Sequence, residues 1–291
     1  MRRPLALVLA MVLLGMVAAP VSALTTQRTW TAGMGSSWYN GRTQLQAYAD
    51  GTGLASVTYQ HLKRNVSYRI DIRAGRCTSL GSVLTTVGWV KTDANGAVTT
   101  TRVVPQWRMN DIWGYARTGS IAVRIATVGS SVCGNFSFPR ATRVRIPGYS
   151  IDLPVIPGNS GYPYCNVAMY QKVLWQPTEP GVSFIYSHAR KGMFLPLLTA
   201  SKINNGAAMV GKLVYVYTSD SKIHTYRITK VRRHVSSIQS AVGITSEKLW
   251  LQTSEGPNST YPKLIIEADR IASGPAAYSS SHPTPHPVTC G

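Results

Sequence analysis

Short runs in which apolar and polar residues alternate recur from Thr43 to Val128, and this spacing constrains the fold more than any other feature of the chain. In the clearest run, Ser67 to Arg73, every second residue is apolar, as in a strand with one buried face. The run from Ile121 to Ile125 repeats the alternation, and D-A-N-G at Asp93 to Gly96 is typical of a turn. Because no helical pattern separates these runs, we expect an antiparallel β-sandwich over residues 24–139.

A second set of strands begins after Pro139, so we place a domain boundary near residue 140 and an all-β domain over residues 140–272. A short helix is expected over Phe194 to Ile203, which has apolar residues at helical spacing, and single helical turns are expected at Met169 to Val173 and Ser236 to Ala241. The expected strands are Arg143 to Pro147, Ile151 to Ile156, Val182 to Tyr186, Leu213 to Thr218, Lys222 to Arg233, Lys248 to Thr253 and Lys263 to Ala268.

Two of these strands end at a serine or a histidine, side chains that can act as a nucleophile and as a base. The stretch from Lys248 to Gly256 reads K-L-W-L-Q-T-S-E-G and predicts a strand that presents Ser254 at its exit. The apolar strand from Val182 ends in the same way at His188. A lone serine or histidine at a strand end is usually structural, so the pair matters more than either residue.

The Ser254 stretch resembles the signature strand of the sortases, T-L-x-T-C, with Trp250 at the first position and Ser254 at the position of the nucleophilic cysteine. The strand that leads into S-H at Ser187 and His188 resembles the family's histidine segment. R-I-P near Pro147 and D-L-P-V from Asp152 resemble the opening strands of a sortase domain. The resemblance covers roughly residues 143–271 and implies a β-barrel.

In the sortases a cysteine, a histidine and an arginine cleave a sorting peptide and pass its acyl group to an amine or to water. The resemblance places the nucleophile at Ser254, the histidine at His188, and the arginine at Lys263 or one residue from it. It therefore implies a peptide sorting signal as partner. We predict that the Ser254 hydroxyl and the His188 ring lie within a few ångströms across one groove, with the Lys263 ammonium facing it.

Serine in place of cysteine leaves three functions open. A serine hydroxyl ionises far less readily than a thiol and needs a general base within hydrogen-bond reach. The chain is therefore a sortase-like peptide-binding protein with weakened or lost activity, an active serine enzyme that uses His188 or Lys263 as base, or a non-enzymatic protein that binds the cell envelope. No obvious carboxylate orients His188 in the sequence, and lysine lacks the planar donor fork of arginine.

The N-terminus predicts export. Arg2 and Arg3 precede an apolar run from Leu5 to Ala19, and V-S-A at residues 21–23 suits a signal peptidase. We expect residues 1–23 to be a signal peptide, or a short anchor if it is not cleaved. Either way, the folded part is expected outside the cytoplasm, in the cell envelope or the medium.

Four cysteines in an exported chain predict two disulfides with three possible connectivities. We expect Cys77 to pair with Cys133 and Cys165 with Cys290, since each pair then respects or closes a domain. Residues 273–291 are rich in Pro, Ser and His and are expected to be flexible unless Cys290 holds them. Neither a metal nor a cofactor is expected, because cysteines and histidines lack ligand spacing and the acidic residues are scattered.

The formal net charge is +19, and the basic residues are spread over both halves of the chain. Nucleic-acid binding proteins concentrate such charge on one face or helix, so no nucleic acid is expected as partner. A diffuse positive surface outside the cell instead suits anionic envelope polymers, although simple solubility explains it equally well.

Overall fold

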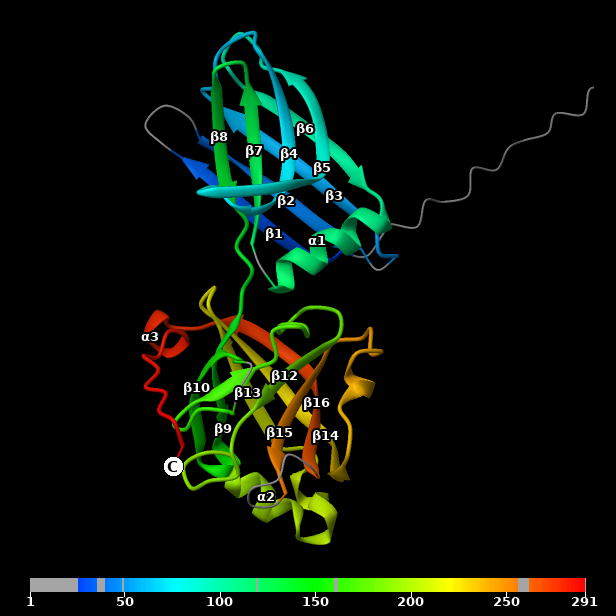
Figure 1. Cartoon of the computed structure of the whole chain (residues 1–291), viewed down its shortest axis with the longest axis vertical. Coiled ribbons are helices and arrows are strands. Elements are labelled where there is room, and N and C mark those ends of the chain that lie inside the picture. The colour runs from blue at the N-terminus through cyan, green and yellow to red at the C-terminus, as the bar shows by residue number, and fades with distance from the viewer. Residues whose placement is uncertain are drawn as a thin grey trace, which may run out of the picture.

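The computed structural model describes residues 26–35, 40–48, 50–118, 120–159, 162–255 and 262–290 (Figure 1). The expected signal peptide at residues 1–23 lies outside these ranges. Across the described ranges, no helix has the length and apolar character needed to cross a membrane. The architecture is all-β with a few short helices, as predicted, and includes a closed barrel.

Two four-stranded antiparallel sheets form the part of the chain before Pro139. The first sheet has the order β1-β2-β3-β6, and the second has the order β5-β4-β7-β8. The strands are β1 Thr26–Gly35, β2 Asn40–Tyr48, β3 Gly53–Gln60, β4 Ser67–Arg76, β5 Ser79–Lys91, β6 Val98–Val104, β7 Ile121–Thr127 and β8 Ser130–Asn135. Buried side chains from both sheets join in one hydrophobic cluster, which includes Trp30, Val57, Ile70 and Val123.

Helix α1, Gln106–Thr118, contradicts the expectation that this part of the chain contains no helix. The buried residues Met109, Ile112, Trp113 and Ala116 follow a spacing of three and four, which is the period of an α-helix with one apolar face. This short helical pattern lies among much stronger strand signals, which hide it in the sequence. The helix packs into the two-sheet core through the Trp113 ring, which meets Trp30 edge-on at 4.5 Å.

Replacing Ile112 with valine tests this packing. Ile112 is fully buried, so removing one methylene group is expected to lower the free energy of unfolding by about 1 kcal/mol. Val103, which is 68% exposed, provides the control, and Val103→Ala should change the stability by less than about 0.5 kcal/mol. Urea unfolding followed by circular dichroism measures both values. Equal effects would contradict the burial of α1.

Eight strands after residue 140 close into a barrel with the order β10-β11-β12-β15-β16-β14-β13-β9. These strands are β9 Ala141–Ile146, β10 Ile151–Pro157, β11 Ala168–Tyr170, β12 Val182–Tyr186, β13 Leu213–Thr218, β14 Lys222–Val235, β15 Lys248–Ser254 and β16 Lys263–Pro275. Their inward side chains fill a second core, separate from that of the two sheets. Every strand expected in this part of the sequence is present.

The helical elements of the barrel agree with expectation except at one point. Helix α2, Leu195–Ser201, lies within the predicted range, and the single turn η3, Gln239–Ala241, ends where expected. The helical turn predicted at Met169–Val173 is wrong, because β11 occupies its first half and pairs with β10 and β12. Two further 3-10 turns, η1 Pro147–Tyr149 and η2 Asn204–Met209, complete the set.

Both predicted disulfides are present. Cys77 bonds Cys133, and Cys165 bonds Cys290 across 125 residues of sequence. Residues 276–290, seen in red in Figure 1, therefore run back along the barrel, as expected when Cys290 holds this segment. Backbone hydrogen bonds hold both ends of this segment, from Ala276 N to Ser221 O and from Cys165 N to Val288 O. The short helix α3, Tyr278–Ser281, lies between them.

Candidate functional site

The ends of three strands bring the predicted site residues to one end of the barrel. β12 and β15 run parallel, with Tyr186 opposite Gln252, and Ser187 N donates a hydrogen bond to Gln252 O. His188 and Ser254 each lie two residues beyond this pair, so both emerge where parallel strands end at one edge. β16 begins at the same edge, because Lys263 pairs directly with Ser254.

Ser254 and Lys263 are in direct contact. The Lys263 Nζ and Ser254 Oγ atoms lie 2.9 Å apart, and the antiparallel pairing of β15 and β16 fixes this approach. Partial burial disfavours the ammonium and lowers the pKa of Lys263 below its usual 10.5. A larger share of this amine is therefore uncharged at mildly alkaline pH than for an exposed lysine. An uncharged amine accepts the proton that a serine must lose to attack a carbonyl.

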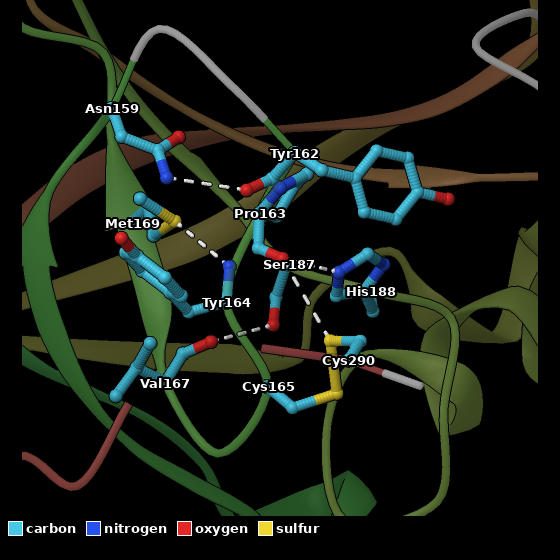
Figure 2. The surroundings of a disulfide bond; sticks show 10 residues. All are labelled: Asn159, Tyr162, Pro163, Tyr164, Cys165, Val167, Met169, Ser187, His188 and Cys290. Carbon is cyan, nitrogen blue, oxygen red and sulfur yellow. Dashed lines mark hydrogen bonds between the residues drawn. A yellow bond between two sulfur atoms is a disulfide. The ribbon is translucent and has the colours of Figure 1, made fainter. Parts of the chain in front are cut away.

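The His188 ring is held by a different set of groups (Figure 2). Its Nε2 lies 2.8 Å from Pro163 O, and a carbonyl oxygen only accepts, so Nε2 carries the proton. The Tyr162 ring packs against the imidazole with centroids 5.0 Å apart. Among the described atoms, no hydrogen bond joins His188 to Ser254 or to Lys263. The predicted closeness of Ser254 and His188 thus stays a prediction, whereas the contact between Ser254 and Lys263 is observed.

His188 also lies beside the disulfide of Cys165 and Cys290, as Figure 2 shows. A ring nitrogen and the two sulfur atoms lie within 4.8 Å of one another, a grouping of the kind that binds metal when the sulfurs are thiolates. Here the sulfurs are bonded to each other. The disulfide therefore fixes the loop that carries Pro163, the hydrogen-bond partner of His188.

The sequence did not reveal a cluster of charged and polar groups around Glu255, next to Ser254. The side chain of Glu255 is 3% exposed and accepts hydrogen bonds from Arg233 Nε at 3.1 Å and from the backbone N of His234 at 2.9 Å. The His234 Nδ1 atom lies 2.7 Å from the same carboxylate. These contacts tie Glu255, the residue after Ser254, to β14. The only signal in the sequence was its position beside the predicted nucleophile.

Several carboxylates of the barrel form ion pairs with residues other than His188. Glu255 is paired as described, Glu247 binds Arg270, and Glu267 binds Arg232. Asp152 and Asp269 bind arginine or lysine in the same way. Lys263 is the basic group that the structure places in contact with Ser254.

No protein-family model matches the chain, and no curated protein matches it in sequence. Among solved structures, Listeria monocytogenes sortase A is similar at 14% identity and a TM-score of 0.40, over 50% of this chain and 98% of that chain. Sortase C2 of pilus island 1 from Group B Streptococcus has 18% identity and a TM-score of 0.37, over 45% and 73%. Streptococcus pneumoniae sortase C has 16% identity and a TM-score of 0.38, over 47% and 71%. These likenesses extend over half of the chain or less.

Proposed function

We propose that the barrel is a sortase-like serine acyl transferase or hydrolase in which Ser254 is the nucleophile and Lys263 is its general base. The 2.9 Å hydrogen bond between Lys263 Nζ and Ser254 Oγ carries this proposal. It satisfies the need of a serine for a base within about 2.6–3.2 Å. The sortase-like motifs at the ends of β12 and β15 supply the substrate class, which is a backbone carbonyl in a peptide sorting signal.

The reaction follows from these two groups. Uncharged Lys263 takes the Ser254 proton while Oγ forms a bond to the peptide carbonyl carbon. The carbon–nitrogen bond then breaks, and the leaving amine takes the proton from Lys263. An incoming amine or water resolves the acyl-serine in the reverse order. When an amine is the acceptor the outcome is transfer, and when water is the acceptor the outcome is hydrolysis.

Lysine is a better candidate base than histidine at this site. The Nε2–H of His188 donates to Pro163 O, which leaves Nδ1 as the basic atom of a ring packed against Tyr162. Among the described residues no hydrogen bond joins this ring to Ser254, whereas Lys263 Nζ lies 2.9 Å from Ser254 Oγ. We assign His188 a place on the wall of the peptide groove, next to the strand end that carries Ser254. There it would contact the substrate without taking the first proton.

A second candidate is a peptide-binding barrel without catalysis. It is favoured by one observation, namely that His188 is hydrogen-bonded to Pro163 instead of Ser254. A purely envelope-binding protein is a third reading, supported by the +19 charge and the exposed Trp89 of the first two sheets. In all three cases, the predicted leader at residues 1–23 and two disulfides support a location outside the cytoplasm.

The pH dependence of covalent capture tests the proposal. A fluorophosphonate probe is expected to label Ser254, as located by peptide mass mapping. The rate should rise with pH as Lys263 loses its proton, and the rise should be centred below 10.5 because burial lowers the pKa of Lys263. Quenched time courses of labelling between pH 6 and pH 10 measure this pH dependence. Absence of label on Ser254 throughout would favour the binding readings.

A further inference from the structure

A cavity lies at the end of the barrel opposite Ser254, next to the two four-stranded sheets. Its volume is about 750 Å³, and its lining includes Thr29 of β1, Pro139 of the connection, and the ends of β14 and β16. Figure 1 shows that end of the barrel, where the red end of β16 meets the yellow turn between β13 and β14. Ser273 lies ten residues along β16 from Lys263, which is about 33 Å in an extended strand. This cavity is therefore distinct from the Ser254 site.

A chain of four polar side chains runs along the wall of this cavity. Ser273 pairs with His224 across β16 and β14, and its Oγ lies 2.8 Å from His224 Nδ1. The other ring nitrogen, Nε2, lies 3.2 Å from Thr218 Oγ, which donates to Asp220 Oδ1 at 2.6 Å. Three of the four, Ser273, His224 and Asp220, line the cavity.

The contacts among these four side chains favour one direction for their protons. Thr218 gives its single hydroxyl proton to Asp220, so it accepts from His224 Nε2–H. In the neutral ring Nδ1 is then the acceptor, and Ser273 donates its own hydroxyl proton to it. Partial burial alone would raise the pKa of Asp220, but hydrogen bonds from Thr218 and Lys222 together outweigh it, so the pKa is lowered and the carboxylate is ionised at neutral pH. The order is that of a serine, a base and an acidic anchor, with one hydroxyl inserted.

The exposure of Ser273 and the burial of His224 also suit a nucleophile and its base. His224 is 3% exposed, whereas Ser273 is exposed and faces the cavity. Arg270 Nη1 lies 3.3 Å from Ser273 Oγ, and Glu247 fixes this guanidinium through Nε at 2.8 and 2.9 Å. A positive charge is thus held beside the attacking oxygen, next to which the carbonyl group of a bound ester would lie.

We propose that Ser273 is a second nucleophile, with His224 as its general base, that hydrolyses carboxylic esters bound in this cavity. The Ser273 proton passes to His224 Nδ1 while Oγ bonds the ester carbonyl carbon, and Arg270 faces the negative charge on the oxygen. The bond to the alkoxy group breaks, and the alcohol leaves with that proton. Water then attacks the acyl carbon and gives one proton to His224 Nδ1. The bond to Ser273 Oγ breaks, His224 passes the proton to Oγ, and the acid leaves.

The test uses the full chain with Ser254→Ala, so that chemistry at the first site is removed. Hydrolysis of 4-nitrophenyl acetate should fall at least tenfold in kcat/KM when Ser273→Ala is added, and a fluorophosphonate should label Ser273 in the Ser254→Ala protein. Ser279→Ala, an exposed serine outside the cavity lining, is the matched control and should leave the rate unchanged. Rates within twofold of each other, or no label on Ser273, would overturn the proposal.

Thr218→Val separates activity from structure. Valine has the shape of threonine but cannot accept from His224, so the base loses its anchor while Ser273 remains. We expect kcat to fall at least fivefold with KM unchanged, because Thr218 touches the base and not the ester. An unchanged kcat in a folded Thr218→Val protein would show that these hydrogen bonds have a structural role and do not assist the base. If this variant does not fold, the exposed Ser273→Ala change still decides the question.

Discussion

Replacing Lys263 with methionine should slow the capture of Ser254 by a fluorophosphonate about 10²–10⁴-fold, which is the range that a positioned general base contributes. Methionine keeps an unbranched stem of similar size at the half-buried position but removes the amine that lies 2.9 Å from Ser254 Oγ. Ser254→Ala should remove labelling at this peptide altogether. Rates of probe incorporation at fixed pH, followed by mass spectrometry, measure both effects.

Two further variants separate the roles of charge and proton transfer. Lys263→Arg retains a positive charge but cannot be deprotonated, so it should be as slow as Lys263→Met if lysine is the base. Lys230→Met, at an exposed position of β14, is the control and should label at the rate of the parent. His188→Ala should slow labelling less than Lys263→Met. A larger loss in His188→Ala would move the role of base from Lys263 to His188.

Removing the disulfide of Cys165 and Cys290 should lower the stability of the barrel by about 2–5 kcal/mol. The bond closes 125 residues of sequence, and the restriction that a cross-link places on the unfolded chain grows with the length of the closed loop. The double variant Cys165→Ala with Cys290→Ala avoids a free thiol. Because the described residues form separate hydrophobic clusters, we would follow unfolding locally, by hydrogen exchange of β12 and β15 amides in increasing urea.

The other disulfide provides the matched comparison. Cys77 and Cys133 are 56 residues apart, so their removal should cost about 0.7 kcal/mol less on the same entropic account. Its effect should appear in β4 and β7 amides and not in the barrel. Exchange in β12 and β15 that is unchanged without Cys165 and Cys290 would show that the bond fixes only residues 276–290.

Strand patterns are sufficient to predict most of the barrel. The apolar runs that become β12 and β15 are short and end clearly. The amino-acid pattern alone therefore places Ser254 and His188 where strands end. The sequence does not predict that Ser254 pairs with Lys263. The loop between the two strands does not fix their register, so several pairings are possible. The observed pairing of β15 and β16 removes that ambiguity.

Two features required the folded chain. Helix α1 is hard to detect because the apolar residues at 109, 112, 113 and 116 are accompanied by Trp107 and Tyr115, which are aromatic but exposed. The cluster of Glu255 with Arg233 and His234 depends on a bulge, since the pairing of β14 with β16 shifts between Arg232 and Val235. His234 also adopts a left-handed backbone at φ 58°, which no spacing rule indicates.

The parallel pairing of β12 with β15 has a consequence for biogenesis. The two strands are separated by the whole β13–β14 hairpin, so the strand that bears Ser254 cannot dock until the residues between Tyr186 and Lys248 have been synthesised. A nascent chain that has just emerged with His188 therefore lacks the strand that carries Ser254. The proposed pair of Ser254 and Lys263 can then form only after Lys263 has been synthesised.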